Sequence, residues 1–256
     1  MLSNTDFKVK QIVFVFAQDG DKLSFSNENV VVKDKAGNVK HQSTCYRLFM
    51  LCIVGNVVIT SGLLQRAKKF GFAICLMTST MKVYQVISTL AEGNTILRKR
   101  QYEYKDIALG KHLIFNKLLN QREALNTFRN KSIAEKEAIS IIDAHMERLH
   151  SATTIQEIMG IEGSAARIYF GQMFNNVNWK GRKPRIKSDY VNATLDIAYN
   201  ILFQVVDAIL CAYGFDTYYG VLHRCFYMRK SLVCDLMETM RPILDLKIRK
   251  TINLKQ

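Results

Sequence analysis

Proline is scarce in this chain, and other signs of an extended or extracellular protein are missing with it. Two prolines in 256 residues, and no low-complexity tract, exclude a proline-rich linker or a largely disordered chain. The six cysteines form no Cys-x-x-Cys pair and lie among apolar neighbours. That pattern is typical of buried free thiols in a reducing compartment, so we expect a globular protein with reduced cysteines.

Long hydrophobic runs and a secretory signal are absent as well. The longest apolar run, from Leu48 to Val54, is far too short to cross a bilayer. The first residues lack the basic-then-apolar order of a signal peptide. We therefore expect a cytoplasmic protein with no membrane partner.

Positive charge is what the chain has in excess. The net charge is +14 and the isoelectric point is about 9.5, with the surplus spread along the whole sequence. Such a balance favours a polyanionic partner, with nucleic acid ahead of an acidic membrane face. Because no single basic tail carries the surplus, it indicates broad contact with phosphates.

The first part of the chain alternates β-branched and aromatic runs with glycine turns, a pattern that predicts strands and hairpins. One short helix is expected at 62–69, capped by Thr60 or Ser61 and ended by Gly71. Residues 1–90 are thus predicted to form a mostly-β domain. The strands are expected at 11–16, 23–26, 29–33, 39–43, 47–54, 72–77 and 81–87.

After a predicted linker at 91–94, apolar residues recur at helical spacing almost to the end. Ser132 and Glu135 form a capping box that marks one helix start. A loop at 179–187 carries five lysines and arginines and no apolar period. The predicted fold class is α+β, with a β domain followed by an all-α domain at 95–256. Its helices are expected at 95–104, 107–129, 132–149, 154–174, 190–213 and 231–242.

Two carboxylates stand out in the last predicted helix, for which Ser231 is the expected N-cap. Asp235 and Glu238 are three residues apart and so lie one turn from each other on one face. At about 6 Å they repel by roughly 2–3 kcal/mol at an effective dielectric near 20. A half-buried pair needs a cation, which is either Arg241, one turn further on, or a metal ion.

Glu162 and His223 are the other candidates for chemistry in the helical half. Glu162 heads a helical stretch, and His223 ends a glycine-bounded turn. Each alone is unremarkable, since a lone histidine after a turn is more often a structural group than a ligand. Combined with the acid pair, they form an oxygen-rich set with one nitrogen, which suits Mg²⁺ or Mn²⁺ better than zinc in the absence of thiolates.

Three ordered motifs resemble those of the CRISPR-associated spacer-acquisition integrases, the metal-dependent DNA endonucleases of CRISPR adaptation. Shorter matches at Val54–Asn56, Leu97–Arg98 with Gln101–Tyr102, Lys117–Gln121, Gly181–Arg185 and Asp189–Asn192 extend the resemblance over nearly the whole chain. The motifs are Glu162-Gly-Ser-Ala-Ala-Arg-Ile-Tyr-Phe170, Gly214-Phe-Asp-Thr-Tyr-Tyr-Gly-Val-Leu-His223 and Leu232-Val-Cys-Asp-Leu-Met-Glu-Thr-Met-Arg-Pro242.

The resemblance implies catalytic residues Glu162, His223, Asp235 and Glu238. Glu162, His223 and Glu238 are the implied ligands of Mg²⁺ or Mn²⁺, with Asp235 as a supporting acid that orients His223 or accepts a proton. It also implies insertion of short DNA duplexes into a CRISPR array by attack of a 3′-hydroxyl on a phosphodiester. The implied partners are double-stranded DNA, as donor duplex and as CRISPR repeat and leader target, and a second copy of the chain through the β domain, as a homodimer or higher homo-oligomer.

Basic residues near these motifs are the expected DNA contacts. Arg167, one turn after Glu162, is either a partner of the acids or a phosphate contact. The expected contacts are Arg167, Lys180, Arg182, Lys183, Arg185, Lys187, Arg224 and Arg241. The chain ends fourteen residues past Pro242, like short variants beside some single-effector CRISPR systems. That end leaves open whether it docks the small ferredoxin-like companion subunit of the family.

Two rival functions remain open at this stage. A non-catalytic, basic, architectural DNA-binding protein explains the charge but not the acid and histidine motifs. A zinc hydrolase predicts activity with Zn²⁺ and none with Mg²⁺, so exchanging the metal separates it from an integrase.

Overall fold

The computed structural model describes residues 8–88, 93–177, 179–184, 186, 189–223 and 226–254. The chain forms two compact units. The β unit comprises Met1–Gln101 and Asp207–Asp216, and the helical unit comprises Tyr102–Val206 and Thr217–Gln256. A strand-rich first part followed by a helical part confirms the predicted α+β class. Of the predicted linker 91–94, residues 91 and 92 lie outside the described residues.

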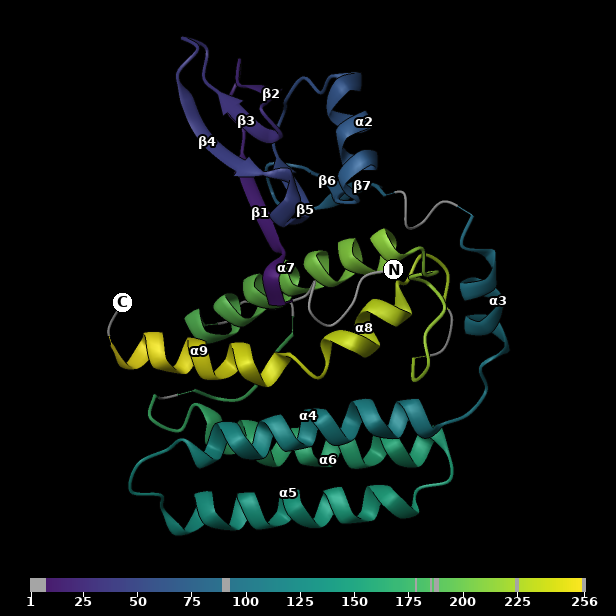
Figure 1. Ribbon diagram of the computed structural model, residues 1–256. Coiled ribbons are helices and arrows are strands. Elements are labelled where there is room, and N and C mark those ends of the chain that lie inside the picture. The colour runs from purple at the N-terminus through teal and green to yellow at the C-terminus, as the bar shows by residue number, and fades with distance from the viewer. Residues whose placement is uncertain are drawn as a thin grey trace. The chain divides into compact units, whose positions relative to one another are not determined.

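Two sheets build the β unit (Figure 1). In the four-stranded sheet, ordered β1-β5-β6-β7, the first three strands are parallel and β7 is antiparallel to β6. The other sheet is an antiparallel meander, β2-β3-β4. The strands are β1 (Gln11–Phe16), β2 (Lys22–Ser26), β3 (Asn29–Lys33), β4 (Val39–Thr44), β5 (Leu48–Val54), β6 (Ala73–Met77) and β7 (Val83–Ile87). The strand predictions are confirmed, although β1 joins β5 and does not pair across the 18–21 turn.

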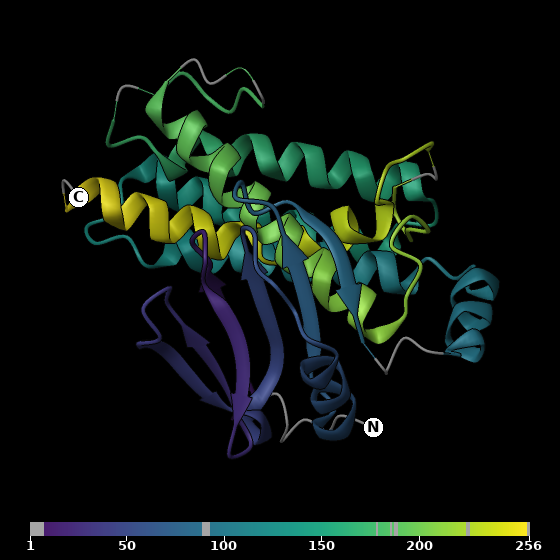
Figure 2. The same ribbon diagram turned by 90° about the horizontal axis from the view of Figure 1, so that it is seen from above.

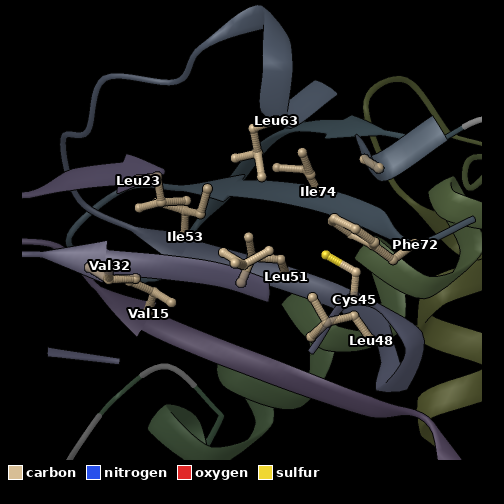
Figure 3. Packing of buried hydrophobic residues seen from close by; sticks show 12 residues of the cluster. Val15, Leu23, Val32, Cys45, Leu48, Leu51, Ile53, Leu63, Phe72 and Ile74 are labelled. Atoms are coloured by element: carbon tan, nitrogen blue, oxygen red, sulfur yellow. The ribbon is translucent and has the colours of Figure 1, made fainter. Parts of the chain in front are cut away.

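Strand β5 is buried along its whole length because both faces of its sheet are covered. On one face Leu51 and Ile53 pack with Leu63 of helix α2 (Ser61–Phe70) and with Phe72, as Figure 3 shows. On the other face the neighbouring β5 side chains pack against Ala208 and Ala212. A fully buried Leu or Ile contributes roughly 1.5–3 kcal/mol, so this strand is the main source of the unit's stability.

The glycine stop in the β unit acts as the sequence predicts, but the predicted side-chain cap is wrong, because the Thr60 side chain makes no cap hydrogen bond and Ser61 lies inside the helix. Helix α2 begins after Thr60 and ends at Gly71, whose φ of 69° is left-handed. A 3₁₀ turn, η1 (Cys45–Arg47), leads into β5. Cys45, Cys52 and Cys75 are buried free thiols, and Cys234 is a half-buried one. Cys211 is half-buried and its thiol donates to Oδ1 of Asp207 at 3.8 Å, while Cys225 lies outside the described residues.

Helices α4, α5 and α6 pack against one another in the helical unit, and α9 lies against α4 and α6 (Figures 1 and 2). Capping boxes start two of them, Ser132 with Glu135 at α5 and Thr154 with Glu157 at α6. The helices after the β unit's strands are α3 (Thr95–Glu103), α4 (Ala108–Asn126), α5 (Ile133–Ser151), α6 (Ile155–Met173), α7 (Tyr190–Tyr213), α8 (Ser231–Met237) and α9 (Arg241–Asn253).

The last predicted helix is wrong in two respects. It does not run unbroken to Pro242, because α8 ends at Met237 and α9 begins at Arg241. A proline ring clashes with the carbonyl four residues earlier, here that of Glu238, so the helix stops and restarts with Pro242 in its first turn. Ser231 lies inside α8, and the N-cap is Lys230, which makes no side-chain cap.

Among the described residues, α7 alone is long and apolar enough to cross a membrane by length and composition, a test that core helices also pass. Several polar residues of this helix are buried or paired within the protein. Asn192, Gln204 and Asp207 are buried, and Asp196 forms an ion pair with Arg182 at 2.5 Å. Buried polar groups need such protein partners, which a lipid environment does not supply.

Candidate active site

Lys117 of helix α4 joins two of the candidate carboxylates. Its ammonium donates to Glu162 on α6 and to Oε2 of Glu238, the latter at 2.5 Å. Lys117 and Glu238 are buried, and the Glu162 side chain is 18% exposed. Three elements far apart in sequence therefore bring one positive and two negative groups to a single point. The ammonium neutralises a carboxylate pair that would otherwise repel.

Glu162 sits beside the buried stripe of α6. That stripe recurs at three- and four-residue intervals and packs into the helical unit: Ile158, Ile161, Ala165, Tyr169 and Met173. A carboxylate at position 162 is next to this stripe and so is carried to its edge, where α4 approaches. The spacing of apolar residues thus fixes where Glu162 can point.

Glu238 lies in the turn between α8 and α9. Arg241 donates to its Oε1 at 2.7 Å, while Lys117 holds Oε2. The side-chain amide of Asn120, on the same helix as Lys117, donates to the Thr239 carbonyl at 2.7 Å. The break forced by Pro242 therefore serves the site, since it exposes a carbonyl for Asn120 and turns Glu238 toward α4.

His223 is held by Asp235, which is completely buried. Asp235 accepts hydrogen bonds from three consecutive backbone N–H groups, those of Val221, Leu222 and His223, at 2.5, 2.9 and 3.1 Å. Its Oδ1 also lies 2.5 Å from Nδ1 of the His223 ring. The carboxylate thereby fixes the loop and makes Nδ1 the protonated nitrogen, which leaves Nε2 as the basic one.

Gly220 allows the loop to come this close to Asp235. A Cβ at this position would lie 2.6 Å from Oδ2 of Asp235 and 2.8 Å from Cβ of Ser231. No side chain fits in that space, so the spacing Gly220-x-x-His223 has a steric cause. The loop is closed further along by the backbone bond from Leu232 N–H to the Thr217 carbonyl.

The acid pair predicted on one helical face is split between two tasks. Glu238 faces Lys117 and Arg241, whereas Asp235 faces His223 and the loop backbone. Within the ranges that the structure describes, no three His, Cys, Asp or Glu side chains form a group that could hold a metal ion. The paired carboxylates Glu162 and Glu238 do fit a hard divalent cation, because their oxygens already share one positive charge and both are the ligand type such ions prefer.

A cavity of about 720 Å³ opens beside the carboxylate pair. Three cationic side chains line it together with three acids: Lys117, Arg182 and Arg241, and Glu162, Asp196 and Asp245. Aromatic surface comes from Phe170, Tyr199 and Phe203 on α6 and α7. A concave site that combines positive charge with aromatic rings suits a phosphate-bearing ligand with a ring to stack, such as a nucleotide.

Asp245 at the base of this cavity is a buried acid that sequence reasoning missed. The hydroxyl groups of Tyr169 and Tyr199 donate to its two oxygens at 3.1 and 2.5 Å. Burial raises the pKa of Asp245 to about 7, although both tyrosine hydrogen bonds and the charge of Arg241 act in the opposite direction. Burial raises the pKa of each tyrosine as well. The partners of Asp245 come from α6 and α7, so no local sequence pattern identifies this acid.

The residues predicted to contact DNA differ in their exposure and in their pairing with acids. Arg182 is turned inward onto Asp196 and Asn192, and Arg241 is paired with Glu238. Three are exposed: Arg167, Lys180 and Lys183. In the part of the chain that the structure describes, Arg167 forms no ion pair with the candidate acids. Arg185, Lys187 and Arg224 lie outside the described residues.

Lys117 and Gln121 are the site residues to which sequence reasoning gave no role. Both belong to the segment Lys117–Gln121, one turn apart on α4, so they lie on one face. A charged and a polar residue on a stripe that is otherwise buried is the signal that could have identified them. Lys117 is 5% exposed and Gln121 is 1% exposed.

Comparison with known proteins settles the family. The family model described as CRISPR associated protein Cas1 matches residues 14–256. The chain belongs to the Cas1 family. A curated Cas1 relative, CRISPR-associated endonuclease Cas1 1 of Thermodesulfovibrio yellowstonii, is 30% identical over 206 residues. The match covers 75% of this chain and 65% of that relative, so the chain spans just under two thirds of its length.

Solved structures share the Cas1 fold. A chain of a partial Cas6-RT-Cas1–Cas2 complex superposes with a TM-score of 0.75 at 22% identity, over 95% of this chain and 76% of that one. A casposase bound to integration product gives a TM-score of 0.68 at 19% identity, over 96% and 73%. At these identities the likeness establishes the fold, while family membership rests on the sequence match.

Proposed function

We propose that this Cas1-family chain is a divalent-metal-dependent DNA endonuclease and integrase that inserts short DNA duplexes into a CRISPR array. The finding that carries the proposal is the convergence of Glu162 and Glu238 on one positive charge, beside a cavity lined by both cationic and acidic side chains, in a chain whose family is established. Relatives named as Cas1 endonucleases support an enzymatic role. A casposase bound to integration product among the structural neighbours agrees with strand joining.

Each side chain of the site has a task in this proposal. Glu162 and Glu238 would hold Mg²⁺ or Mn²⁺, which would supply Lewis-acid stabilisation of charge on a phosphate oxygen. The structure does not group His223 with these two carboxylates, so its proposed role as third ligand through Nε2 requires its loop to move toward them. Asp235 keeps Nδ1 of His223 protonated and the ring oriented. In this arrangement Asp235 acts on the imidazole and does not itself touch substrate.

Binding of DNA falls to the cationic surface. Arg182 and Arg241 lie at the cavity wall, where they can position a phosphate next to the carboxylate pair. Exposed Lys180, Lys183 and Arg167 would contact further phosphates, which predicts weakly sequence-selective, salt-sensitive binding. The 3′-hydroxyl of a bound donor end would then attack the phosphodiester of the target DNA. If water takes the place of that hydroxyl, the same site would act as a nuclease.

Strand joining by purified protein tests the function. A short duplex with 3′-hydroxyl ends, supercoiled target DNA and Mn²⁺ or Mg²⁺ should give joined products. Glu162→Gln, Glu238→Gln and His223→Ala should each lower the yield by about 10³-fold, because each removes a group that acts on the reacting phosphate. All three should still bind DNA, since none of them is a phosphate-binding cation.

Two controls separate this function from its rivals. A donor with 3′-dideoxy ends cannot join, so products formed with it would point to nicking and not to integration. An architectural protein would keep its activity in His223→Ala, and a zinc hydrolase would work with Zn²⁺ and not with Mg²⁺. Either result would overturn the proposal.

Two-ended insertion needs two sites at a fixed separation, and one chain supplies one. We therefore include in the proposal a homodimer or larger homo-oligomer formed through the β unit. The structural neighbours from Cas1–Cas2 complexes support adding a companion subunit, for which the small ferredoxin-like protein suggested by the resemblance is the candidate. Light scattering of the preparation used for joining should show at least a dimer. A monomer at working concentration would remove that part of the proposal.

A further inference from the structure

Lys117 occupies the point where the two candidate metal ligands meet. Its ammonium is within hydrogen-bond reach of Glu162 and Glu238 at once, and it is 5% exposed. Burying a charge costs several kcal/mol unless it is paired, so this lysine is stable here only because of the two carboxylates. The carboxylates depend on it in the same way, since without a cation they repel each other.

A second acceptor lies one turn further along the same helix. Gln121 is 1% exposed, and its Oε1 has no hydrogen-bond partner. It lines the same cavity as Lys117 and Glu162. An unsatisfied buried carbonyl oxygen destabilises the folded chain, so it is not a neutral feature of a helix core. Side chains at i and i+4 are neighbours, so the Lys117 ammonium can reach Gln121 without any movement of α4.

We propose that Lys117 is a two-position cation that competes with the divalent ion for Glu162 and Glu238. In one position its ammonium bridges the carboxylates, as the structure shows. In the other it donates to Oε1 of Gln121, and the carboxylates are free to bind a metal ion. Lys117 is then a positioning residue that keeps the site assembled and sets its affinity for metal, and Gln121 is the acceptor that makes release possible.

This inference rests on the proposed function for the identity of the ligands, but its test does not depend on DNA chemistry. Metal binding is measured on the full chain by electron paramagnetic resonance of free Mn²⁺ and by calorimetry. Lys117→Met keeps the length of the side chain and removes the charge. Because the competitor is gone, Mn²⁺ should bind about tenfold more tightly, the order of coupling typical between linked sites.

The melting temperature gives a second readout, which should not change if Lys117 has no part in the carboxylate site. Without metal, Lys117→Met should melt below the wild type, since the two carboxylates lose their common partner. Adding Mn²⁺ should raise its melting temperature more than that of the wild type, as expected when a ligand binds the folded state more tightly.

Two further variants make the test specific. Lys136→Met makes the same substitution at an exposed lysine of α5 that does not line the cavity, so it should leave Mn²⁺ affinity within about threefold of wild type. Gln121→Leu removes the alternative acceptor and should weaken Mn²⁺ binding about tenfold, but only while Lys117 is present. In Lys117→Met the change at 121 should have no effect on Mn²⁺ affinity.

Weaker or unchanged Mn²⁺ binding in Lys117→Met would overturn the inference. If Lys117 only orients the two carboxylates, removing it should lower or leave unchanged the affinity for Mn²⁺, and not raise it. An equal effect of Gln121→Leu with and without Lys117 would overturn the two-position part. Failure of the proposed function looks different: strand joining would then survive Glu162→Gln, whatever the Mn²⁺ affinities are.

Discussion

The two units of this chain differ in what they bury. In the described residues of the β unit the core is aliphatic and aromatic with cysteine thiols, and its buried charged residues are Asp21 and Asp207. The helical unit buries Lys117 and four acids: Glu135, Asp235, Glu238 and Asp245. The same chain thus contains one unit arranged for packing and one that takes charges out of water.

Buried charge lowers stability unless it is paired, so a unit that buries five such side chains depends on a partner for each of them. In the helical unit the pairs are cross-linked between helices: Lys117 with Glu162 and Glu238, and Asp245 with two tyrosines. The candidate active site of this protein thus lies in the unit where an unpaired charge would cost the most folding free energy. Substitutions in each unit can test that view.

The largest effect on stability is expected in the β unit. Leu51→Ala removes a side chain that is 0% exposed at the centre of the sheet core and should cost about 3 kcal/mol of unfolding free energy. Strand joining per folded molecule should stay unchanged, because no candidate site residue belongs to this unit. Urea unfolding and the joining assay measure the two quantities. A loss of joining equal to that of His223→Ala would break the comparison.

A smaller loss of stability with a large loss of function is expected for Gly220→Ala. The new methyl group collides with Asp235 and Ser231, so the loop must shift and His223 shifts with it. This shift should lower the free energy of unfolding by about 2 kcal/mol. Joining should fall far more than folding does. Gly160→Ala on α6 is the matched control, since nothing lies near its Cβ position. That variant should gain up to about 1 kcal/mol and join DNA normally.

A different kind of effect, the slope of stability with pH, separates the two units. Burial raises the pKa of Asp245 to about 7, so the folded chain holds a proton there that the unfolded chain releases near pH 4. Stability should therefore fall as pH rises from about 4 to about 7, and Asp245→Asn should flatten that slope. Unfolding in urea at pH 5 and pH 8, for both proteins, measures it. Equal slopes in the two proteins would contradict the prediction.

Asp21 of the β unit makes stability change with pH in the opposite direction. The Gln18 N–H and Lys40 hold the pKa of Asp21 below its usual range. Its contribution to stability is therefore present above about pH 4 and is lost as pH falls through the lowered pKa. Asp21→Asn should differ from wild type at pH 5 and converge with it only in stronger acid, whereas the effect of Asp245→Asn is largest above pH 7.

Much of the fold could be predicted because its signals are local. Capping at Ser132, the glycine stop at Gly71 and the all-apolar run of β5 each act within a few residues, and each is found where it was expected. The break between α8 and α9 was missed although Pro242 marks it, because the apolar spacing around it continues the helical period. Partners of strands are not local, so the pairing of β1 with β5 could not be predicted from the turn that follows β1.

The candidate site was predictable as a set of residue types and not as a geometry. Glu162, His223, Asp235 and Glu238 stand in ordered motifs, and their roles stay predictions until the joining assay is done. Asp235 contacts His223 and Glu238 contacts Lys117. These pairings depend on the direction in which the chain turns at the break between α8 and α9. Lys117, Gln121 and Asp245 carry no motif that spacing alone can assign, since their partners are 45 to 121 residues away or absent.

By itself the sequence determined the order of elements, the two-part fold class and the residue types that can carry phosphodiester chemistry, because periodicity, caps and composition act over one or two turns of chain. Only the tertiary structure decided which charges meet. An ion pair in a protein interior depends on distance and on exclusion of water, and both arise when α4, α6 and the α8–α9 turn pack together. That packing places a lysine where two carboxylates converge, which no stretch of sequence could reveal.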